Sequence, residues 1–165
     1  MDSLLPTVAR IGAVLTERGQ TIAVVESSAG GLVSAALLSV PGASAYFLGG
    51  AVVYTASARA AFLGIAEAEM TGLRSSSEPY ALLLARTVRE RFGTTWGIAE
   101  TGAAGPSGNR YGDAAGHTCV ALSGPVERVI TIETGETDRV TNMRTFAAGL
   151  FDLLSDALAA EPSAA

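Results

Sequence analysis

Residues 27–58 form a stretch of 32 positions without a single charged side chain. The regular apolar part, residues 32–40, ends at Pro41-Gly42, well short of the ~20 apolar residues that a membrane-spanning helix needs. The rest of the stretch is rich in Gly, Ser and Ala, and the chain begins Met1-Asp2-Ser3-Leu4, without the basic and apolar regions of a signal peptide. The stretch therefore predicts a buried core, and we expect neither a membrane partner nor a leader.

The composition excludes several kinds of chemistry and of partner. With 165 residues the chain has the length of one domain, and its net charge of -5 leaves no broad basic surface for nucleic acids. All 11 basic residues are arginines, so Schiff-base, P-loop and Ser-Lys chemistry are excluded. A single His, His117, and a single Cys, Cys119, cannot form the usual zinc site. We expect no metal, no cofactor and no nucleic-acid partner, and a core Cys119 in a cytoplasmic protein.

Apolar periodicity predicts alternating helices and strands. Helices are expected over residues 4–18, 32–40, 57–63, 77–92 and 138–158, and strands over 21–25, 46–54, 95–99, 118–122 and 129–133. The last two strands form a hairpin in this interpretation, and Gly49-Gly50 indicate a bulge or a close backbone approach in the second. The order predicts a single α/β domain over residues 1–160, a three-layer α/β/α sandwich with a mixed sheet, and a frayed tail at residues 161–165.

Two glycine-rich segments follow predicted strands, where ligands of open α/β sheets bind. The first, Ser27-Ser28-Ala29-Gly30-Gly31, opens a helix, so its free N–H groups and hydroxyls predict a site for a phosphate. The second runs from Thr101-Gly102 past Gly105-Pro106, in a loop of about 16 residues that is unusually long for a compact domain. For either segment alone, glycines that only permit tight packing are as good an explanation as a ligand site. The presence of two such segments in one small domain favours the ligand site.

Three other side chains are candidates for chemistry. Glu26 and Glu100 end predicted strands, so we expect them to face a cleft unless they are solvated strand ends. Ser44 has the first Gly of a nucleophile elbow two residues before it, but Tyr46 stands where that motif needs its second Gly. A hydrolase triad therefore has weak support, because only His117 could serve it. These residues predict a metal-free site for a small anionic ligand without naming a reaction.

Four motifs, in the same order and at similar spacing, resemble the CinA C-terminal domain family. They are Glu26-Ser27-Ser28-Ala29-Gly30-Gly31, Pro41-Gly42-Ala43-Ser44-Ala45-Tyr46-Phe47, Gly50-Ala51-Val52-Val53-Tyr54 and Thr101-Gly102-Ala103-Ala104-Gly105-Pro106, against the family patterns E-S-C-T-G-G, V-x-G-S-S-x-x-F, G-x-x-x-Y-S-N-x-x-K and T-G-x-A-G-P. The similarity covers about residues 4–158. It implies an amidohydrolase of pyridine-nucleotide salvage that converts nicotinamide mononucleotide (NMN) to nicotinate mononucleotide and ammonia. It also implies the stand-alone form, without the N-terminal domain of larger CinA proteins.

The resemblance implies roles for single residues. Ser44 would be the nucleophile, Tyr54 would line or polarise the site, and Arg59 stands at the motif lysine. The substrate would be held by residues of the two glycine-rich segments: Glu26, Ser27, Ser28, Gly30, Gly31, Thr101, Gly102 and Gly105. A nucleotide phosphate suits a glycine-rich helix start, so both arguments lead to one cleft that binds a small-molecule nucleotide. We also expect a homo-oligomer.

The chain departs from the family pattern at several positions. Ser28 and Ala29 replace the motif Cys and Thr, Ala43 replaces the first Ser of G-S-S, and Thr55-Ala56 replace S-N. Arg59 is the most consequential departure, because an arginine can supply positive charge but stays protonated and cannot act as a base.

The segment Gly108–Asp113 also differs from the usual family sequence and brings Arg110 and Tyr111 of its own, which allows a shifted substrate. Three hypotheses stay open: an NMN deamidase, another small-molecule amidohydrolase or esterase on this scaffold, and a non-catalytic nucleotide-binding relative.

Overall fold

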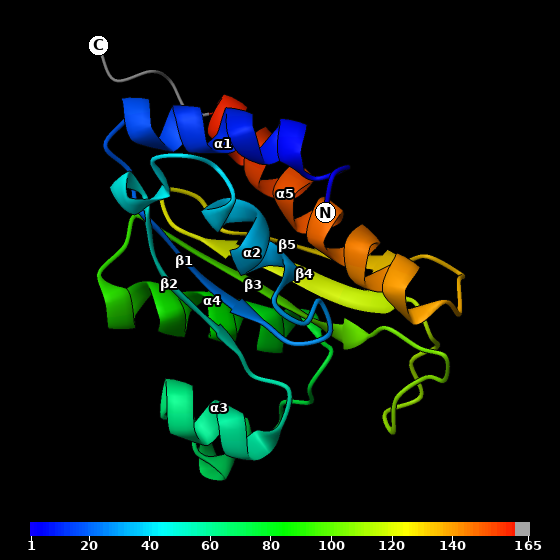
Figure 1. Cartoon of the computed structure of the whole chain (residues 1–165). Coiled ribbons are helices and arrows are strands. Elements are labelled where there is room, and N and C mark those ends of the chain that lie inside the picture. Colours follow the sequence, from blue (N-terminus) through cyan, green and yellow to red (C-terminus); the bar gives the residue numbers. More distant parts are fainter. Residues whose placement is uncertain (161–165) are drawn as a thin grey trace.

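The structure of the chain, a computed structural model, describes residues 1–160, so the tail expected at residues 161–165 lies outside the described residues. Within residues 1–160 five strands form one mixed sheet, in the order β2-β1-β3-β4-β5 (Figure 1). Their bounds are β1 Ile22–Glu26, β2 Phe47–Val52, β3 Trp96–Ala103, β4 His117–Ser123 and β5 Arg128–Glu133. β1 runs parallel to both β2 and β3, whereas β3, β4 and β5 are antiparallel, with β4 and β5 as the predicted hairpin.

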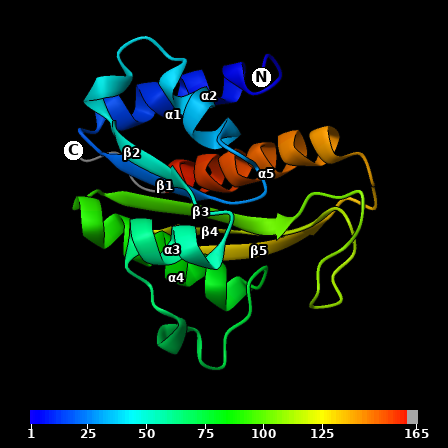
Figure 2. The ribbon, with the colours of Figure 1, turned by 60° about the horizontal axis from the view of Figure 1, so that its bottom comes forward.

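Helices cover both faces of the sheet (Figure 2). One face carries α1 (Leu5–Glu17), α2 (Leu32–Leu38) and α5 (Arg139–Ala160), and the other carries α4 (Glu78–Phe92) with α3 (Ala56–Leu63) beside it; η1 (Ala43–Ala45) and η2 (Glu67–Met70) are short 3-10 helices. The predicted α/β fold with a mixed sheet is confirmed. None of the helices within residues 1–160 is both long and apolar enough to cross a bilayer.

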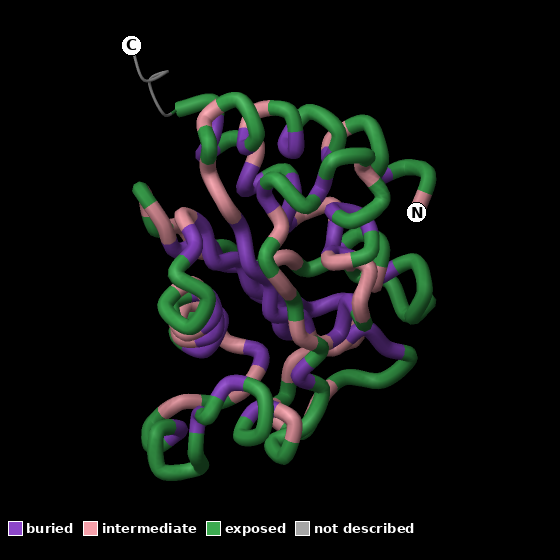
Figure 3. Tube along the Cα trace, turned by 60° about the vertical axis from the view of Figure 1, so that its left-hand side comes forward, coloured by how far each residue is buried: buried purple, intermediate pink, exposed green. Residues whose placement is uncertain are grey.

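The sheet separates two apolar cores, and the alternation of β1 shows why. Ile22 and Val24 pack on the α1–α2–α5 side, whereas Ala23 and Val25 pack on the α4 side, so the whole strand is buried. Burial is concentrated along the central strands, and most of the outer loops are exposed (Figure 3). The uncharged stretch is thus only partly core. β2, predicted as a buried strand, lies at the sheet edge and leaves Leu48 exposed.

The glycines of β2 behave as predicted. The pairing of β1 with β2 slips at Leu48, which gives the expected irregularity. A Cβ on Gly49 would lie 2.6 Å from the Phe92 ring, and one on Gly50 would lie 2.4 Å from the Ser34 hydroxyl. These close approaches require residues without a side chain.

β3 is longer than predicted, because it takes in the first residues of the segment read as a loop. Thr101 and Ala103 pair with Cys119 and His117 of β4. A Cβ on Gly102, between them, would lie 2.4 Å from the carbonyl oxygen of His117. This glycine therefore permits the close packing of β3 on β4 instead of forming a turn. The pairing of the two strands consequently continues as far as Ala103 and His117.

Candidate functional site

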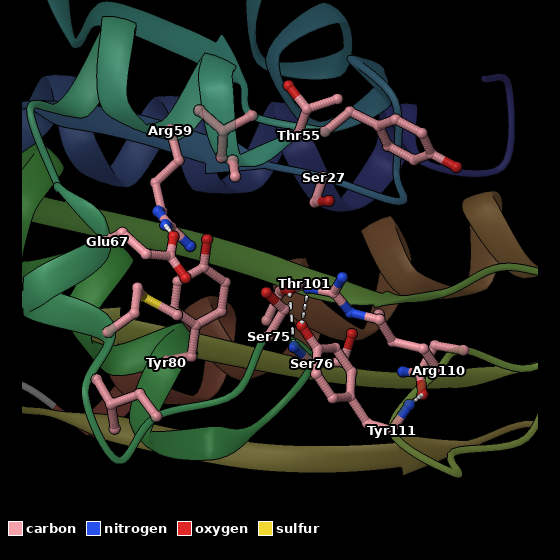
Figure 4. Close-up of a pocket in the computed structure, with 17 residues that line it drawn as sticks. Ser27, Thr55, Arg59, Glu67, Ser75, Ser76, Tyr80, Thr101, Arg110 and Tyr111 are labelled. Atoms are coloured by element: carbon pink, nitrogen blue, oxygen red, sulfur yellow. Dashed lines mark hydrogen bonds and ion pairs between the residues drawn. The ribbon is translucent and has the colours of Figure 1, made fainter.

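A cleft of about 490 Å³ lies where the parallel strands β1, β2 and β3 have their carboxyl ends (Figure 4). Its walls come from the residues after β1 and β2, from the end of β3, from α3 and η2, and from the segments that precede α4 and β4. The side chains labelled in Figure 4 are Ser27, Thr55, Arg59, Glu67, Ser75, Ser76, Tyr80, Thr101, Arg110 and Tyr111. This is the edge at which open α/β sheets bind ligands.

Glu26, the last residue of β1, is fully buried and closes the start of α2. Its carboxylate accepts hydrogen bonds from the N–H groups of Gly31 at 2.8 Å, Val33 at 3.0 Å and Ser34 at 2.9 Å. The Ser34 hydroxyl adds a bond of 2.7 Å. The N–H groups at the start of α2 are therefore occupied by a carboxylate of the chain itself. This occupancy argues against the phosphate site predicted at Ser27–Gly31.

Glu100 in β3 is a second fully buried carboxylate. It accepts hydrogen bonds from the N–H groups of Ser27 at 3.1 Å and Ala29 at 2.8 Å, from the Thr118 hydroxyl at 2.9 Å, and from the Ser28 hydroxyl. Burial raises the pKa of Glu100, and these hydrogen bonds oppose the rise. The expectation that the two strand-end carboxylates face a cleft is therefore wrong. Both are used to hold the turn between β1 and α2.

Arg59 is a buried cation in the wall formed by α3. Its side chain is 6% exposed, and Nη2 donates to the Glu67 carboxylate at 2.6 Å. Nε donates to the Ile65 carbonyl at 3.4 Å. Since Glu67 neutralises it, Arg59 contributes N–H donors at a fixed position more than net charge.

A second cavity of about 270 Å³ adjoins the cleft and shares Tyr54, Gly102 and Asn109 with it. Arg139, at the start of α5, lies in its wall and donates to the Gly105 carbonyl at 2.7 Å and to the Tyr54 hydroxyl at 3.1 Å. Within residues 1–160 no carboxylate lies at salt-bridge distance from this guanidinium. The second cavity therefore carries an uncompensated positive charge.

The segment between β3 and β4 is fixed by its own hydrogen bonds. The Asn109 side-chain oxygen accepts the N–H groups of Tyr111 at 2.9 Å and Asp113 at 3.2 Å. Asp113 in turn pairs with both terminal nitrogens of Arg74, at 2.5 and 3.0 Å, which lowers the pKa of its carboxyl. Among the described residues no three His, Cys, Asp or Glu side chains are grouped so as to hold a metal ion.

The sequence model of the CinA C-terminal domain family matches residues 5–158, which is nearly the whole chain. This chain belongs to the CinA C-terminal domain family. The CinA-like protein of Synechococcus sp. (strain CC9902) is 42% identical over 123 residues, 74% of this chain and 29% of that protein. The CinA-like protein of Myxococcus xanthus (strain DK1622) is 39% identical over 155 residues, 90% of this chain and 36% of that protein. The chain thus spans about a third of the length of these curated relatives.

Solved structures agree with this CinA fold. The competence damage-inducible protein A (ComA) from Klebsiella pneumoniae subsp. pneumoniae MGH 78578 superposes with a TM-score of 0.89, over 96% of this chain and 99% of that one, at 22% identity. The competence/damage inducible protein CihA from Agrobacterium tumefaciens gives a TM-score of 0.84, over 94% and 95% of the two chains, at 26% identity.

In this CinA domain Ser44 does not lie in the cleft. It is an exposed residue of η1, which precedes β2, whereas Tyr54 follows β2. The six residues of β2 separate the two by about 20 Å at ~3.3 Å per residue. The predicted convergence of Ser44 with Tyr54 and Arg59 in one cleft is therefore wrong, because residues at the two ends of a strand lie at opposite edges of the sheet.

The other predicted residues divide into three groups. Ser27, Tyr54, Arg59, Thr101 and Gly102 line the cleft, Ser28 and Gly105 line the adjoining cavity, and Glu26, Gly30 and Gly31 line neither. The last group serves the β1–α2 turn. A Cβ on Gly30, for example, would lie 2.7 Å from the Met143 side chain, and the backbone φ of Gly30 is +67°.

Sequence reasoning did not identify Glu67, Tyr80 or Arg139 as parts of the site. The sequence around Glu67 is typical of an exposed surface residue, and Tyr80 belongs to no motif. Arg139 did carry a signal, because it opens a long helix, where the helix dipole disfavours a cation. An arginine at that position indicates a binding partner, although the sequence does not say which one.

Proposed function

We propose that this chain is an amidohydrolase that cleaves the amide of a pyridine mononucleotide, converting NMN to nicotinate mononucleotide and ammonia, with Ser27 instead of Ser44 as the nucleophile. The observation that carries the proposal is the position of Ser27. Its backbone is fixed by Glu100, while its hydroxyl has no hydrogen bond within the described residues and lines the cleft. A serine whose backbone is fixed and whose hydroxyl faces the cleft is positioned to attack the carbonyl carbon of a bound ligand.

The proposed reaction uses groups that line the same cleft as Ser27. The Ser27 oxygen attacks the amide carbon, and its proton passes by way of water to Glu67, the one carboxylate among the described residues that line the cleft. Guanidinium N–H groups of Arg59 stabilise the negative oxygen of the tetrahedral intermediate. The C–N bond then breaks, the nitrogen takes the proton and leaves as ammonia, and water hydrolyses the acyl-serine to release the acid. Arg59 itself cannot be the base.

The remaining groups suit the rest of a mononucleotide. Arg139 offers an uncompensated guanidinium for the phosphate, in the cavity that adjoins the cleft. The rings of Tyr54, Tyr80 and Tyr111 line the cleft, and a pyridinium ring is attracted to aromatic faces.

Ammonia release from NMN by the purified protein tests the proposal. Ser27→Ala is expected to lower the rate at least ~10³-fold, as loss of a covalent nucleophile does, whereas Ser44→Ala, a strand length away, is expected to retain it. A Ser27→Ala protein with wild-type turnover, or a loss of turnover in Ser44→Ala alone, would contradict the assignment.

Two other outcomes identify the alternatives. Labelling of Ser27 by a reactive-serine probe, without ammonia from NMN, identifies a different amidohydrolase or esterase. Saturable nucleotide binding with neither labelling nor ammonia identifies a non-catalytic nucleotide-binding protein.

A further inference from the structure

The arginines around the cleft differ in how they are neutralised. Arg59 is paired with Glu67, and Arg74 with Asp113. Arg110, like Arg139 in the adjoining cavity, has no carboxylate of residues 1–160 at salt-bridge distance. The connected cavities therefore contain two uncompensated guanidinium groups, whereas a mononucleotide phosphate accounts for one.

Arg110 is an exposed side chain that contacts its neighbour Tyr111. Its Nη2 donates to the Tyr111 hydroxyl at 2.8 Å, and its guanidinium carbon lies 5.0 Å from the centre of the Tyr111 ring. The guanidinium carbon of Arg74 lies 5.7 Å from the centre of the same ring, so two guanidinium groups lie near Tyr111. The hydrogen bond from Arg110 is the largest of the effects that lower the pKa of Tyr111.

The guanidinium of Arg110 points into the cleft. Figure 4 shows its side chain reaching from the β3–β4 segment toward Thr101, and Ser27 lines the same cleft. A guanidinium has five N–H donors, and the bond to Tyr111 is the one side-chain hydrogen bond that Arg110 makes within the described residues. The donors that remain match the two oxygens of a carboxylate.

We propose that Arg110, oriented by Tyr111, forms a second anion subsite, so that this cleft preferentially binds mononucleotides whose base carries a carboxylate. The phosphate lies at Arg139 and the carboxylate at Arg110, with Tyr54 and Asn109 between the two cavities. The proposal rests on the proposed function in one respect, since it takes the cleft to hold a mononucleotide with its phosphate at Arg139. Its consequence for that function is that the acid product binds more tightly than the amide substrate.

Two matched pairs of nucleotides test the subsite by titration calorimetry. Nicotinate mononucleotide and NMN differ in a carboxylate against an amide, and orotidine 5′-monophosphate and uridine 5′-monophosphate differ in the presence of a carboxylate. The titrations use the Ser27→Ala protein so that NMN is not consumed. In each pair the carboxylate ligand is expected to bind at least about tenfold more tightly, the ratio that a charge-assisted hydrogen bond typically supplies.

Variants assign the preference to a residue. Arg110→Ala is expected to abolish the difference within each pair while retaining the weaker affinity, and Tyr111→Phe is expected to reduce it. Arg10→Ala removes the same charge from an exposed position on α1 and is expected to leave the difference unchanged.

Equal affinities within both pairs would overturn the proposal, as would an Arg110→Ala protein that weakens both members of a pair equally. So would the absence of binding by all four nucleotides. If only the proposed function is wrong, the carboxylate ligands still bind more tightly, but wild-type protein releases no ammonia from NMN. If only the subsite is wrong, wild-type protein releases ammonia, but the two ligands of each pair bind with equal affinity.

Discussion

At the scale of single residues, two buried carboxylates do the work expected of a bound anion. Glu26 accepts the N–H groups at the start of α2, and Glu100 accepts those of Ser27 and Ala29. The β1–α2 turn is therefore fixed before any ligand arrives. A serine held in this way loses little conformational entropy when it reacts, which is the benefit of a preorganised site.

Replacing Glu100 by Gln tests this role. The amide exchanges one acceptor oxygen for an NH₂ group that faces other donors, so buried N–H or O–H groups lose their partner. We expect Glu100→Gln to lower the free energy of unfolding by about 1–3 kcal/mol in denaturant titrations. Glu90→Gln makes the same exchange on the exposed side of α4 and is expected to stay within about 0.5 kcal/mol of wild type. Equal stability of the two variants would refute the role assigned to Glu100.

At the scale of elements, the close packing of α4 on β3 positions the wall that carries Tyr80. A Cβ on Gly97 of β3 would lie 2.1 Å from the carbonyl oxygen of Ala85, a backbone atom of α4. Gly12 of α1 is less constrained, since a Cβ there would meet the Tyr46 side chain at 3.1 Å. A backbone atom in a helix cannot move aside without its helix, whereas a side chain can adjust.

Alanine substitutions at these two glycines should therefore change the free energy of unfolding by amounts that differ in sign or in size. Gly97→Ala is expected to destabilise by about 1–3 kcal/mol through overpacking, seen as a lower midpoint of thermal unfolding. Gly12→Ala is expected to cost less, because alanine in a helix gains up to about 1 kcal/mol over glycine, which offsets the contact with Tyr46. A Gly97→Ala protein as stable as Gly12→Ala would show that α4 can shift on the sheet.

The elements themselves could be predicted because their signals are local. The helix expected over residues 77–92 is α4, and Gly93 ends it in the left-handed conformation. The extension of β3 could not be predicted, since Gly102 is required by a strand that follows later in the chain. The contact of Arg139 with Tyr54 spans 85 positions and left no local signal of its partner. The position of Ser44 was predictable in principle, because a residue that precedes a strand and a residue that follows it lie at opposite ends of that strand.

At the scale of the whole molecule, His117 connects the site to the far edge of the sheet. From the start of β4 its Nε2 faces the Ser76 carbonyl at 2.9 Å, beside the cleft, and its Nδ1 faces the Glu133 carboxylate of β5. Asp113 of the β3–β4 segment lies 3.7 Å from Nε2, and the Cys119 thiol lies 3.8 Å from it. Both ring nitrogens thus face acceptors, and only the protonated imidazolium can donate to both.

The stability of the protein should therefore fall as pH rises past neutrality. Burial, the largest effect, lowers the pKa of His117, but the bonds to Glu133 and to the Ser76 carbonyl, with the charge of Asp113, outweigh it and raise the pKa overall. A folded-state pKa above the unfolded value of about 6.5 means that the contribution is complete below that pH and is lost as pH rises through the folded pKa. Denaturant midpoints measured from pH 5.5 to 8.5 should decline over this interval. Since His117 is the one histidine of the chain, His117→Gln should remove the decline. A midpoint that rises with pH, or an unchanged slope in His117→Gln, would refute the assignment.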